Sequence, residues 1–159
     1  MPKKPTCAPL SSTGVPGAGK STWVNGQDWP LDSVYVSTDK HVEQYAASLG
    51  KTYNEVFDEF MPEAIKLMIR DVEFAREHGF DVVWDQTSVS VKSRKRKFNM
   101  LPNYTHVAVV FSTPTPSELE LRLASRPGKS IPRAVMQSMI NNFEYPSAEE
   151  GFTEIIQVS

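Results

Sequence analysis

The sequence predicts an α/β fold of three layers, in which a mostly parallel five-stranded sheet lies between helices and carries a small helical lid. Short apolar runs with the composition of strands alternate with segments of helical periodicity, which is the pattern of parallel βαβ units. The chain has 159 residues, of which 40% are hydrophobic, enough to bury a full core. It contains no internal repeat and no long linker, so we expect residues 1–159 to form a single domain.

The first strand is expected within residues 6–13, directly before a glycine-rich segment. Pro9 lies inside it, and proline removes a hydrogen-bond donor from a ladder, so we expect this strand to be irregular or shortened. A helix is expected to open within residues 21–25, and residues 33–37 have the composition of a brief strand.

Hydrophobic periodicity predicts the later elements. Residues 62–78 are expected to form a helix, because their apolar residues recur on one face, Pro62 suits a first turn and Gly79 suits the stop. Residues 106–112 are a continuous apolar run of the kind found in strands that are covered on both faces. The other expected elements are strands at residues 80–85 and 153–158, and helices at residues 117–124 and 132–142.

Composition excludes several classes of protein. The formal net charge is −2, so only a local patch of basic residues could bind nucleic acid. Cys7 is the only cysteine, which excludes an internal disulfide and agrees with a reducing compartment. No apolar run approaches the roughly 20 residues of a membrane span, and residues 1–13 do not resemble a signal peptide. We therefore expect a soluble cytoplasmic protein without a membrane partner.

One glycine-rich segment indicates a phosphate-binding loop. It fits the pattern G-x-x-x-x-G-K-[ST] at every fixed position, and it reads Gly14-Val15-Pro16-Gly17-Ala18-Gly19-Lys20-Ser21-Thr22. Glycines let the backbone approach an anion closely, and the loop amides, with the N-terminus of the following helix, attract phosphate. In such a loop Lys20 supplies a charge for the β- and γ-phosphates of ATP, and Ser21 supplies a hydroxyl ligand for Mg²⁺. The alternative is a glycine-rich turn in which Lys20 and Ser21 occur by chance.

Two acidic residues follow expected strands. Asp39 comes after the strand at residues 33–37, and Asp85 ends the strand at residues 80–85. Ligands of open parallel sheets bind beyond the carboxyl ends of the strands, so we expect Asp39 on the same rim as Lys20. Asp39 can accept a proton from an incoming hydroxyl, whereas Asp85 can hold Mg²⁺ or its water shell. The alternatives are that Asp39 caps a helix and that Asp85 is a turn residue.

A basic segment at residues 122–129 ends a helix and enters a Pro-Gly turn, which is typical of a mobile lid. Arginines on a lid can neutralise charge that develops on a transferring phosphoryl group, and Arg122 and Arg126 are the candidates. The alternative is a solvated basic helix end, which the helix dipole favours.

A second basic run, residues 92–97, carries five positive charges in six positions. It favours either a patch that binds a polyanion or a solvated helix face. Trp84 and Phe98 lie near this run in the sequence, and they either stack on a nucleic-acid base or belong to the core.

Over nearly its whole length the chain resembles the kinase domain of bacteriophage-type polynucleotide 5′-hydroxyl kinases and related small P-loop kinases. The resemblance rests on residues 14–23, on Asp39, on residues 85–87 and on residues 122–132. It implies a P-loop kinase fold in which Lys20 and Ser21 belong to the ATP site and Asp39 is the general base. It also implies that Arg126 contacts the nucleotide phosphates, with Arg122 near it.

One position departs from the family pattern. Polynucleotide 5′-kinases usually carry an arginine three residues after the general base, and here that residue is Val42. Lys40 or His41 would have to hold the phosphate of the acceptor in its place. The acceptor therefore stays open between a 5′ end of DNA and a hydroxymethyl group on a modified pyrimidine such as 5-hydroxymethyluracil, in single-stranded or flipped-out form.

These observations lead to one hypothesis and two alternatives. The hypothesis is a kinase dependent on ATP and Mg²⁺ that phosphorylates a hydroxyl on DNA, in the host cytoplasm if a phage encodes it. The first alternative keeps the chemistry and replaces DNA by a small molecule or a nucleotide-sugar. The second is an ATP-sensing module without transfer activity, which Asp39 and the two arginines disfavour because binding alone does not need them.

Overall fold

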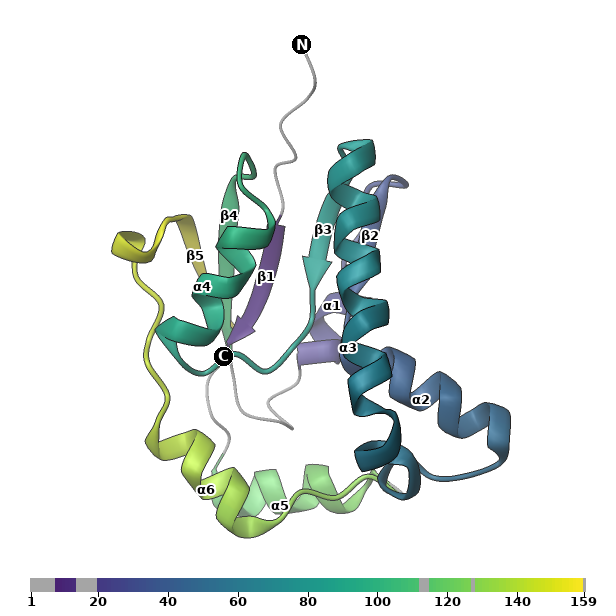
Figure 1. The fold of residues 1–159 in the computed structure, drawn as a ribbon. Coiled ribbons are helices and arrows are strands. Elements are labelled where there is room, and N and C mark those ends of the chain that lie inside the picture. Colours follow the sequence, from purple (N-terminus) through teal and green to yellow (C-terminus); the bar gives the residue numbers. More distant parts are fainter. Residues whose placement is uncertain (1–7, 14–19, 112–114, 127, 159) are drawn as a thin grey trace.

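A computed structural model describes residues 8–13, 20–111, 115–126 and 128–158 (Figure 1). Its strands are β1 (Ala8–Thr13), β2 (Ser33–Val36), β3 (Asp81–Trp84), β4 (His106–Phe111) and β5 (Phe152–Val158). Its helices are α1 (Lys20–Asn25), α2 (Thr38–Leu49), α3 (Tyr53–His78), α4 (Val91–Met100), α5 (Pro116–Ala124), α6 (Arg133–Asn141) and the 3₁₀ turn η1 (Ala148–Glu150).

The strands pair in parallel in two hydrogen-bonded groups. β4 lies between β1 and β5, and β2 pairs with β3. β1 lies beside β3, so the spatial order is β2-β3-β1-β4-β5 (Figure 1). The described residues show ladders of three and of two strands, whereas the sequence predicts one sheet of five. The irregular first strand is confirmed, because the register of β1 against β4 shifts between Ala8 and Ser11, where Pro9 lacks a donor.

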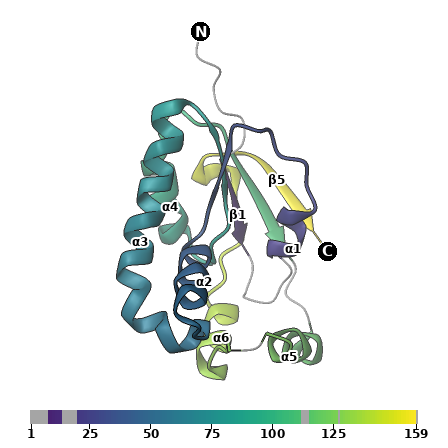
Figure 2. The same ribbon diagram turned by 90° about the vertical axis from the view of Figure 1, so that its right-hand side faces the viewer.

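Helices cover both faces of the strands, so the predicted three-layer arrangement is confirmed (Figure 2). α3 packs on one face of β2 and β3, where Val72, Val82 and Trp84 belong to one buried cluster. Val83 faces the other side and joins Val24 of α1 in a second cluster. Successive residues of β3 thus enter different cores, as the pleat of a strand requires.

The long helix α3 begins earlier than its sequence pattern suggests. We expect a start at Pro62, but the helix starts at Tyr53, and the Thr52 side chain caps it by accepting a hydrogen bond from the Glu55 amide at 3.3 Å. Pro62 is exposed inside the helix, at the loss of one backbone bond. The turns of α3 before and after Pro62 pack against α2, and the apolar side chains that they bury there offset that loss. The predicted stop is confirmed, since Gly79 adopts φ 68° at the end.

The other predicted strands and helices agree with the structure to within one residue at each described end. α5 and α6 form the expected helical pair beyond the carboxyl ends of the strands (Figure 1). Leu119 of α5 and Met136 of α6 are buried in a small cluster of their own, apart from the cores beside the strands. In the part of the chain that the structure describes, no helix is both long and apolar enough to cross a bilayer.

The basic run of α4 is divided between surface and interior. The Arg94 side chain is fully buried and forms a two-pronged ion pair with Glu150, with N···O distances of 2.8 and 3.1 Å. Lys97 is also buried, with its ammonium 5.3 Å from the centre of the Trp84 ring. Two of the five charges are therefore structural, and the run is neither a uniform patch nor a uniformly solvated face.

The core alternative is confirmed for both aromatic residues of this region. Trp84 is 1% exposed in the cluster under α3. Phe98 packs against the rings of His106 and Phe152. The alternative that these rings stack on a base is not supported, because Trp84 is enclosed in the core and Phe98 is packed against two rings of the interior.

Glu150→Gln should lower the free energy of unfolding by about 3 kcal/mol, because it leaves the buried Arg94 charge without a counter-ion. Urea unfolding measures this loss. Glu120→Gln is a matched control, since its ion pair with Arg133 joins side chains that are 69% and 90% exposed and should contribute little. Equal losses in the two variants would contradict the structural role of the buried pair.

Candidate functional site

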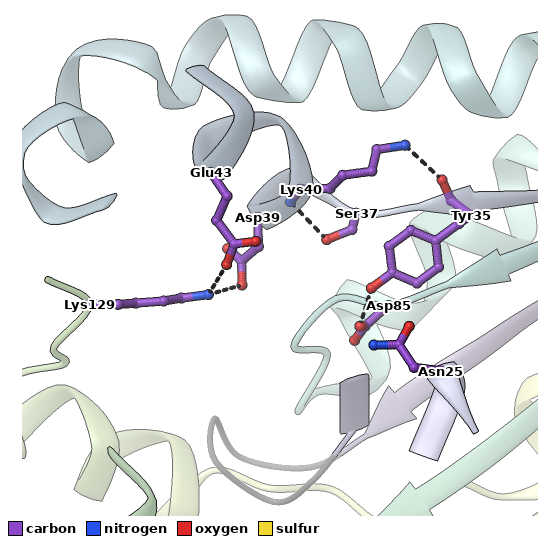
Figure 3. A pocket seen from close by; sticks show the side chains of 8 residues that line it. All are labelled: Asn25, Tyr35, Ser37, Asp39, Lys40, Glu43, Asp85 and Lys129. Atoms are coloured by element: carbon purple, nitrogen blue, oxygen red, sulfur yellow. Dashed lines mark hydrogen bonds and ion pairs between the residues drawn. The ribbon is translucent and has the colours of Figure 1, made fainter. Parts of the chain in front are cut away.

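A polar pocket of about 280 Å³ lies at the carboxyl ends of β2 and β3 (Figure 3). Asp39 enters it from the first turn of α2, and Asp85 enters it directly after β3. Both acids therefore lie on one rim, whereas the place of Lys20 on it stays a prediction, because its side chain lies outside the described residues. The lining residues are Asn25, Tyr35, Ser37, Asp39, Lys40, Glu43, Asp85 and Lys129.

Asp39 does not cap α2, so the capping alternative is wrong. Ser37 is the N-cap, and its hydroxyl accepts a hydrogen bond from the Lys40 amide at 3.3 Å. The Asp39 carboxylate points instead into the pocket, where Oδ1 accepts a hydrogen bond from the Tyr53 hydroxyl at 2.7 Å. Its Oδ2 lies 3.2 Å from the Lys129 ammonium. A carboxylate that faces a pocket and is half exposed is available to a ligand.

Asp85 is buried in the pocket wall, at 7% exposure. Its amide donates to the Val36 carbonyl at 2.8 Å, which extends the pairing of β2 with β3 by one residue. The Tyr35 hydroxyl donates a hydrogen bond to its Oδ2. Asp85 is thus a fixed carboxylate at the end of a strand and not a solvated turn residue.

This carboxylate fits the predicted role at Mg²⁺. The ion prefers oxygen ligands, and in nucleotide sites it takes one or two from the protein and the rest from phosphates and water. The described residues hold no group of three or more His, Cys, Asp or Glu side chains that could form a full cage. Asp85 would therefore hold the ion or its water shell together with Ser21, whose side chain lies outside the described part of the chain.

The phosphate-binding motif stands in the context that it requires. β1 ends at Thr13 and α1 begins at Lys20, so the glycine-rich segment joins a strand to a helix. Residues 14–19 lie outside the described residues, as do the side chains of Lys20 and Ser21; Thr22 is exposed. The contacts of these residues with ATP stay a prediction.

The two predicted lid arginines do not line the pocket. Arg122 is exposed on the last turn of α5, and Arg126 is half-buried just beyond it. Lys129, three residues further on, is the cation of this segment that reaches the pocket, where it also lies 2.9 Å from Glu43. The roles of Arg122 and Arg126 at a nucleotide stay predictions.

The position that departs from the family pattern points away from the pocket. Val42 is fully buried between α2 and α3. Of the two residues before it, Lys40 lines the pocket, donating to the Tyr35 carbonyl at 3.1 Å. His41 instead pairs with Asp71 of α3 at 2.7 Å and is not among the lining residues. Lys40 alone of the two could meet a ligand there.

The pocket and support residues that were not expected from the sequence include Tyr35, Glu43, Tyr53 and Lys129. Glu43 follows Asp39 by four residues on α2, a spacing that places both on one face and could have been recognised. Lys129 belongs to the basic segment at residues 122–129, but nothing in the sequence shows that it, and not Arg122 or Arg126, points into the pocket. No local pattern links Tyr53 to Asp39.

Tyr53 is a fixed hydrogen-bond donor. Burial raises the pKa of its hydroxyl, and the hydrogen bond to Asp39 and the charges of Asp39 and Glu43 raise it further. The charge of Arg126 opposes these effects and lowers the pKa. The phenol therefore stays protonated at neutral pH and keeps donating to Asp39.

The fold and this pocket define an α/β protein of the P-loop type. Residues 12–146 match the AAA domain family AAA_33, and the chain belongs to that family. It is 24% identical over 142 residues to the L-seryl-tRNA(Sec) kinase of Methanococcus maripaludis. That match covers 86% of this chain and 52% of the relative, so the chain spans about half the length of that protein.

Two solved structures share the fold. The crystal structure of a "putative kinase" from Chloroflexus aurantiacus J-10-fl has a TM-score of 0.69 at 18% identity, covering 98% of this chain and 88% of that one. A gluconokinase from Sinorhizobium meliloti 1021 has a TM-score of 0.53 at 17% identity, covering 98% and 83%. The predicted P-loop kinase fold is therefore confirmed. The comparisons give no specific support to a polynucleotide kinase, to DNA or to a phage origin, and they agree better with the small-molecule alternative.

Asp39→Asn should lower the pKa of Tyr53, because it removes the negative charge that the hydroxyl faces. The pKa should stay above its ordinary value, since burial, the largest cause, persists. Nuclear magnetic resonance of ring-labelled tyrosine during an alkaline titration measures this change. Tyr104 is an internal control, because burial and Asp81 raise its pKa and neither is altered. A Tyr53 ring that titrates at the same pH in both proteins would contradict its contact with Asp39.

Proposed function

We propose that this protein is an ATP-dependent kinase that transfers the γ-phosphoryl group to a hydroxyl of a small polar acceptor. The observation that carries the proposal is the Asp39 carboxylate, which faces Asp85 across one pocket at the carboxyl ends of the strands, beside the helix that follows the phosphate-binding motif. Nucleotide binding alone would not need a half-exposed carboxylate opposite Asp85, the acid that we propose holds Mg²⁺.

The proposed chemistry assigns one task to each group. The loop amides of residues 14–19 and Lys20 would hold the phosphates of ATP, and Ser21 and Asp85 would hold Mg²⁺, which neutralises phosphate charge when bound. Asp39 would accept the proton of the acceptor hydroxyl as its oxygen bonds to the γ-phosphorus and the bond to ADP breaks. Arg126, with Arg122, would contact the phosphates if the lid segment approaches them.

The pocket lining favours a small acceptor without phosphates. The lining has three carboxylates, Asp39, Glu43 and Asp85, against two ammonium groups, Lys40 and Lys129. A DNA strand needs an excess of cations along its backbone and aromatic faces for its bases. The volume of about 280 Å³ suits a small molecule. The names of two similar proteins, a gluconokinase and an L-seryl-tRNA(Sec) kinase, point to hydroxyls on a sugar acid and on a seryl group.

Asp39→Asn should lower kcat for phosphoryl transfer by roughly 100-fold or more, because the amide cannot accept the proton in the transition state. The affinity for ATP should stay within about twofold, since the base acts only in the chemical step. Steady-state transfer and nucleotide titration measure the two quantities. Asp58→Asn, at an exposed position on α3, is the matched control. Normal turnover in Asp39→Asn would reject the proposed base.

Transfer of labelled phosphate from ATP to acceptors in parallel tests the substrate class. The panel is gluconate and related sugar acids, free serine, serylated tRNA, nucleosides, 5′-hydroxyl oligonucleotides and hydroxymethylated duplex DNA. We expect transfer to a small hydroxyl compound, abolished in Lys20→Ala. Transfer to the DNA substrates alone would overturn the small-acceptor proposal. ATP binding with a conformational response and no transfer would favour the sensing module.

A further inference from the structure

Asp39 is held at both carboxylate oxygens by side chains from other elements. The Tyr53 hydroxyl, at the start of α3, donates to Oδ1 at 2.7 Å, and the Lys129 ammonium lies 3.2 Å from Oδ2. Two bonds to separate partners fix the rotation of a carboxylate that would otherwise turn freely. The Asp39 side chain nevertheless keeps 50% of its surface exposed, so holding it does not close it to a ligand.

The two partners of Asp39 also contact each other. The Lys129 ammonium lies 4.4 Å from the centre of the Tyr53 ring, and its side chain is only 15% exposed. The ring itself packs against the buried cluster between α2 and α3. A lysine that is largely withdrawn from water needs counter-charge, and Asp39 and Glu43 supply it. Lys129 and Tyr53 therefore form one support with Asp39 (Figure 3 shows its Lys129 side).

The backbone around Lys129 is fixed on the first turn of α3. The Asn54 amide donates to the Gly128 carbonyl at 2.9 Å, and the Asn54 side chain exchanges hydrogen bonds with Ser130 at 2.7 and 3.2 Å. Gly128 has φ +70°, and a Cβ there would stand 2.5 Å from the Thr52 Cβ. Glycine is thus required for this close approach, which sets Lys129 beside the residue that follows Thr52.

We infer that Tyr53 and Lys129 are positioning residues for Asp39, and that docking of residues 128–130 on α3 and the orientation of Asp39 depend on each other. The mutual dependence rests on these contacts and on no assumption about activity. The effect on turnover rests on the proposed function, in which Asp39 is the base.

Amide hydrogen exchange of the free protein tests the mutual dependence without any assumption about activity. The Asn54 and Ser130 amides report docking, because their acceptors lie across the contact. Lys129→Met and Asp39→Asn should each accelerate exchange at these two amides by about tenfold or more. Arg133→Met removes the cation of an exposed ion pair between α6 and Glu120 of α5, and it should leave both rates unchanged. Unaltered exchange in Lys129→Met and Asp39→Asn would overturn the inference.

Kinetics with the acceptor found in the panel test the positioning role. Lys129→Met and Tyr53→Phe should each lower kcat by roughly 10- to 100-fold, because a displaced base loses alignment, while the KM for ATP changes little. Lys129→Arg should restore part of the loss. Tyr104→Phe removes a hydroxyl that bonds backbone carbonyls away from the pocket, and it should keep normal kcat.

The double variant separates a role through Asp39 from a general loss of structure. In an Asp39→Asn background, Lys129→Met should lower kcat by less than about twofold further, because the group that it positions is already gone. Additive losses, or normal kcat in Lys129→Met and Tyr53→Phe, would overturn the positioning role. A wild-type protein that phosphorylates nothing in the panel would overturn the proposed function, and the exchange rates would then decide the mutual dependence by themselves.

Discussion

The parallel, in-register pairing of β2 with β3 is the constraint on which the pocket depends. Val36 pairs with Trp84, and the next amide, that of Asp85, bonds the Val36 carbonyl. The chain leaves both strands at the same level, so the helix cap at Ser37 and the carboxylate of Asp85 share one rim. Ser37 caps the N-terminus of α2, so the Asp39 side chain is not needed as a cap and points into the pocket. Backbone geometry, more than any attraction between side chains, brings the two acids together.

Much of this arrangement could be predicted because it follows from local patterns. β4 could be predicted because it is a continuous apolar run, as buried strands are. The end of α3 could be predicted because a glycine with positive φ follows it. The start of α3 is not, because Pro62 imitates a first-turn proline while the true cap, Thr52, is an ordinary polar residue. Tertiary packing of the first turns against α2 decides between them.

The wrong start of α3 also conceals the contribution of Tyr53 to the candidate site. With α3 expected to begin at Pro62, Tyr53 has no assigned place, and its contact with Asp39 cannot be anticipated. Lys129 cannot be singled out from the sequence for a different reason. A run of basic residues does not show which side chain points into a pocket, and here that depends on the close approach of Gly128 to Thr52. Asp39 and Asp85, in contrast, could be predicted, since the carboxyl ends of parallel strands lie at the same edge of a sheet.

The buried Arg94–Glu150 pair bears on where this fold ends. The family match stops at residue 146, yet the counter-ion of Arg94 and the strand that flanks β4 both come after it. A fragment that ends at residue 146 would lack β5, which pairs with β4, and it would leave the buried Arg94 without its counter-ion. The boundary of similarity is therefore not a boundary of folding, and any shortened version of this protein has to retain residues 147–158.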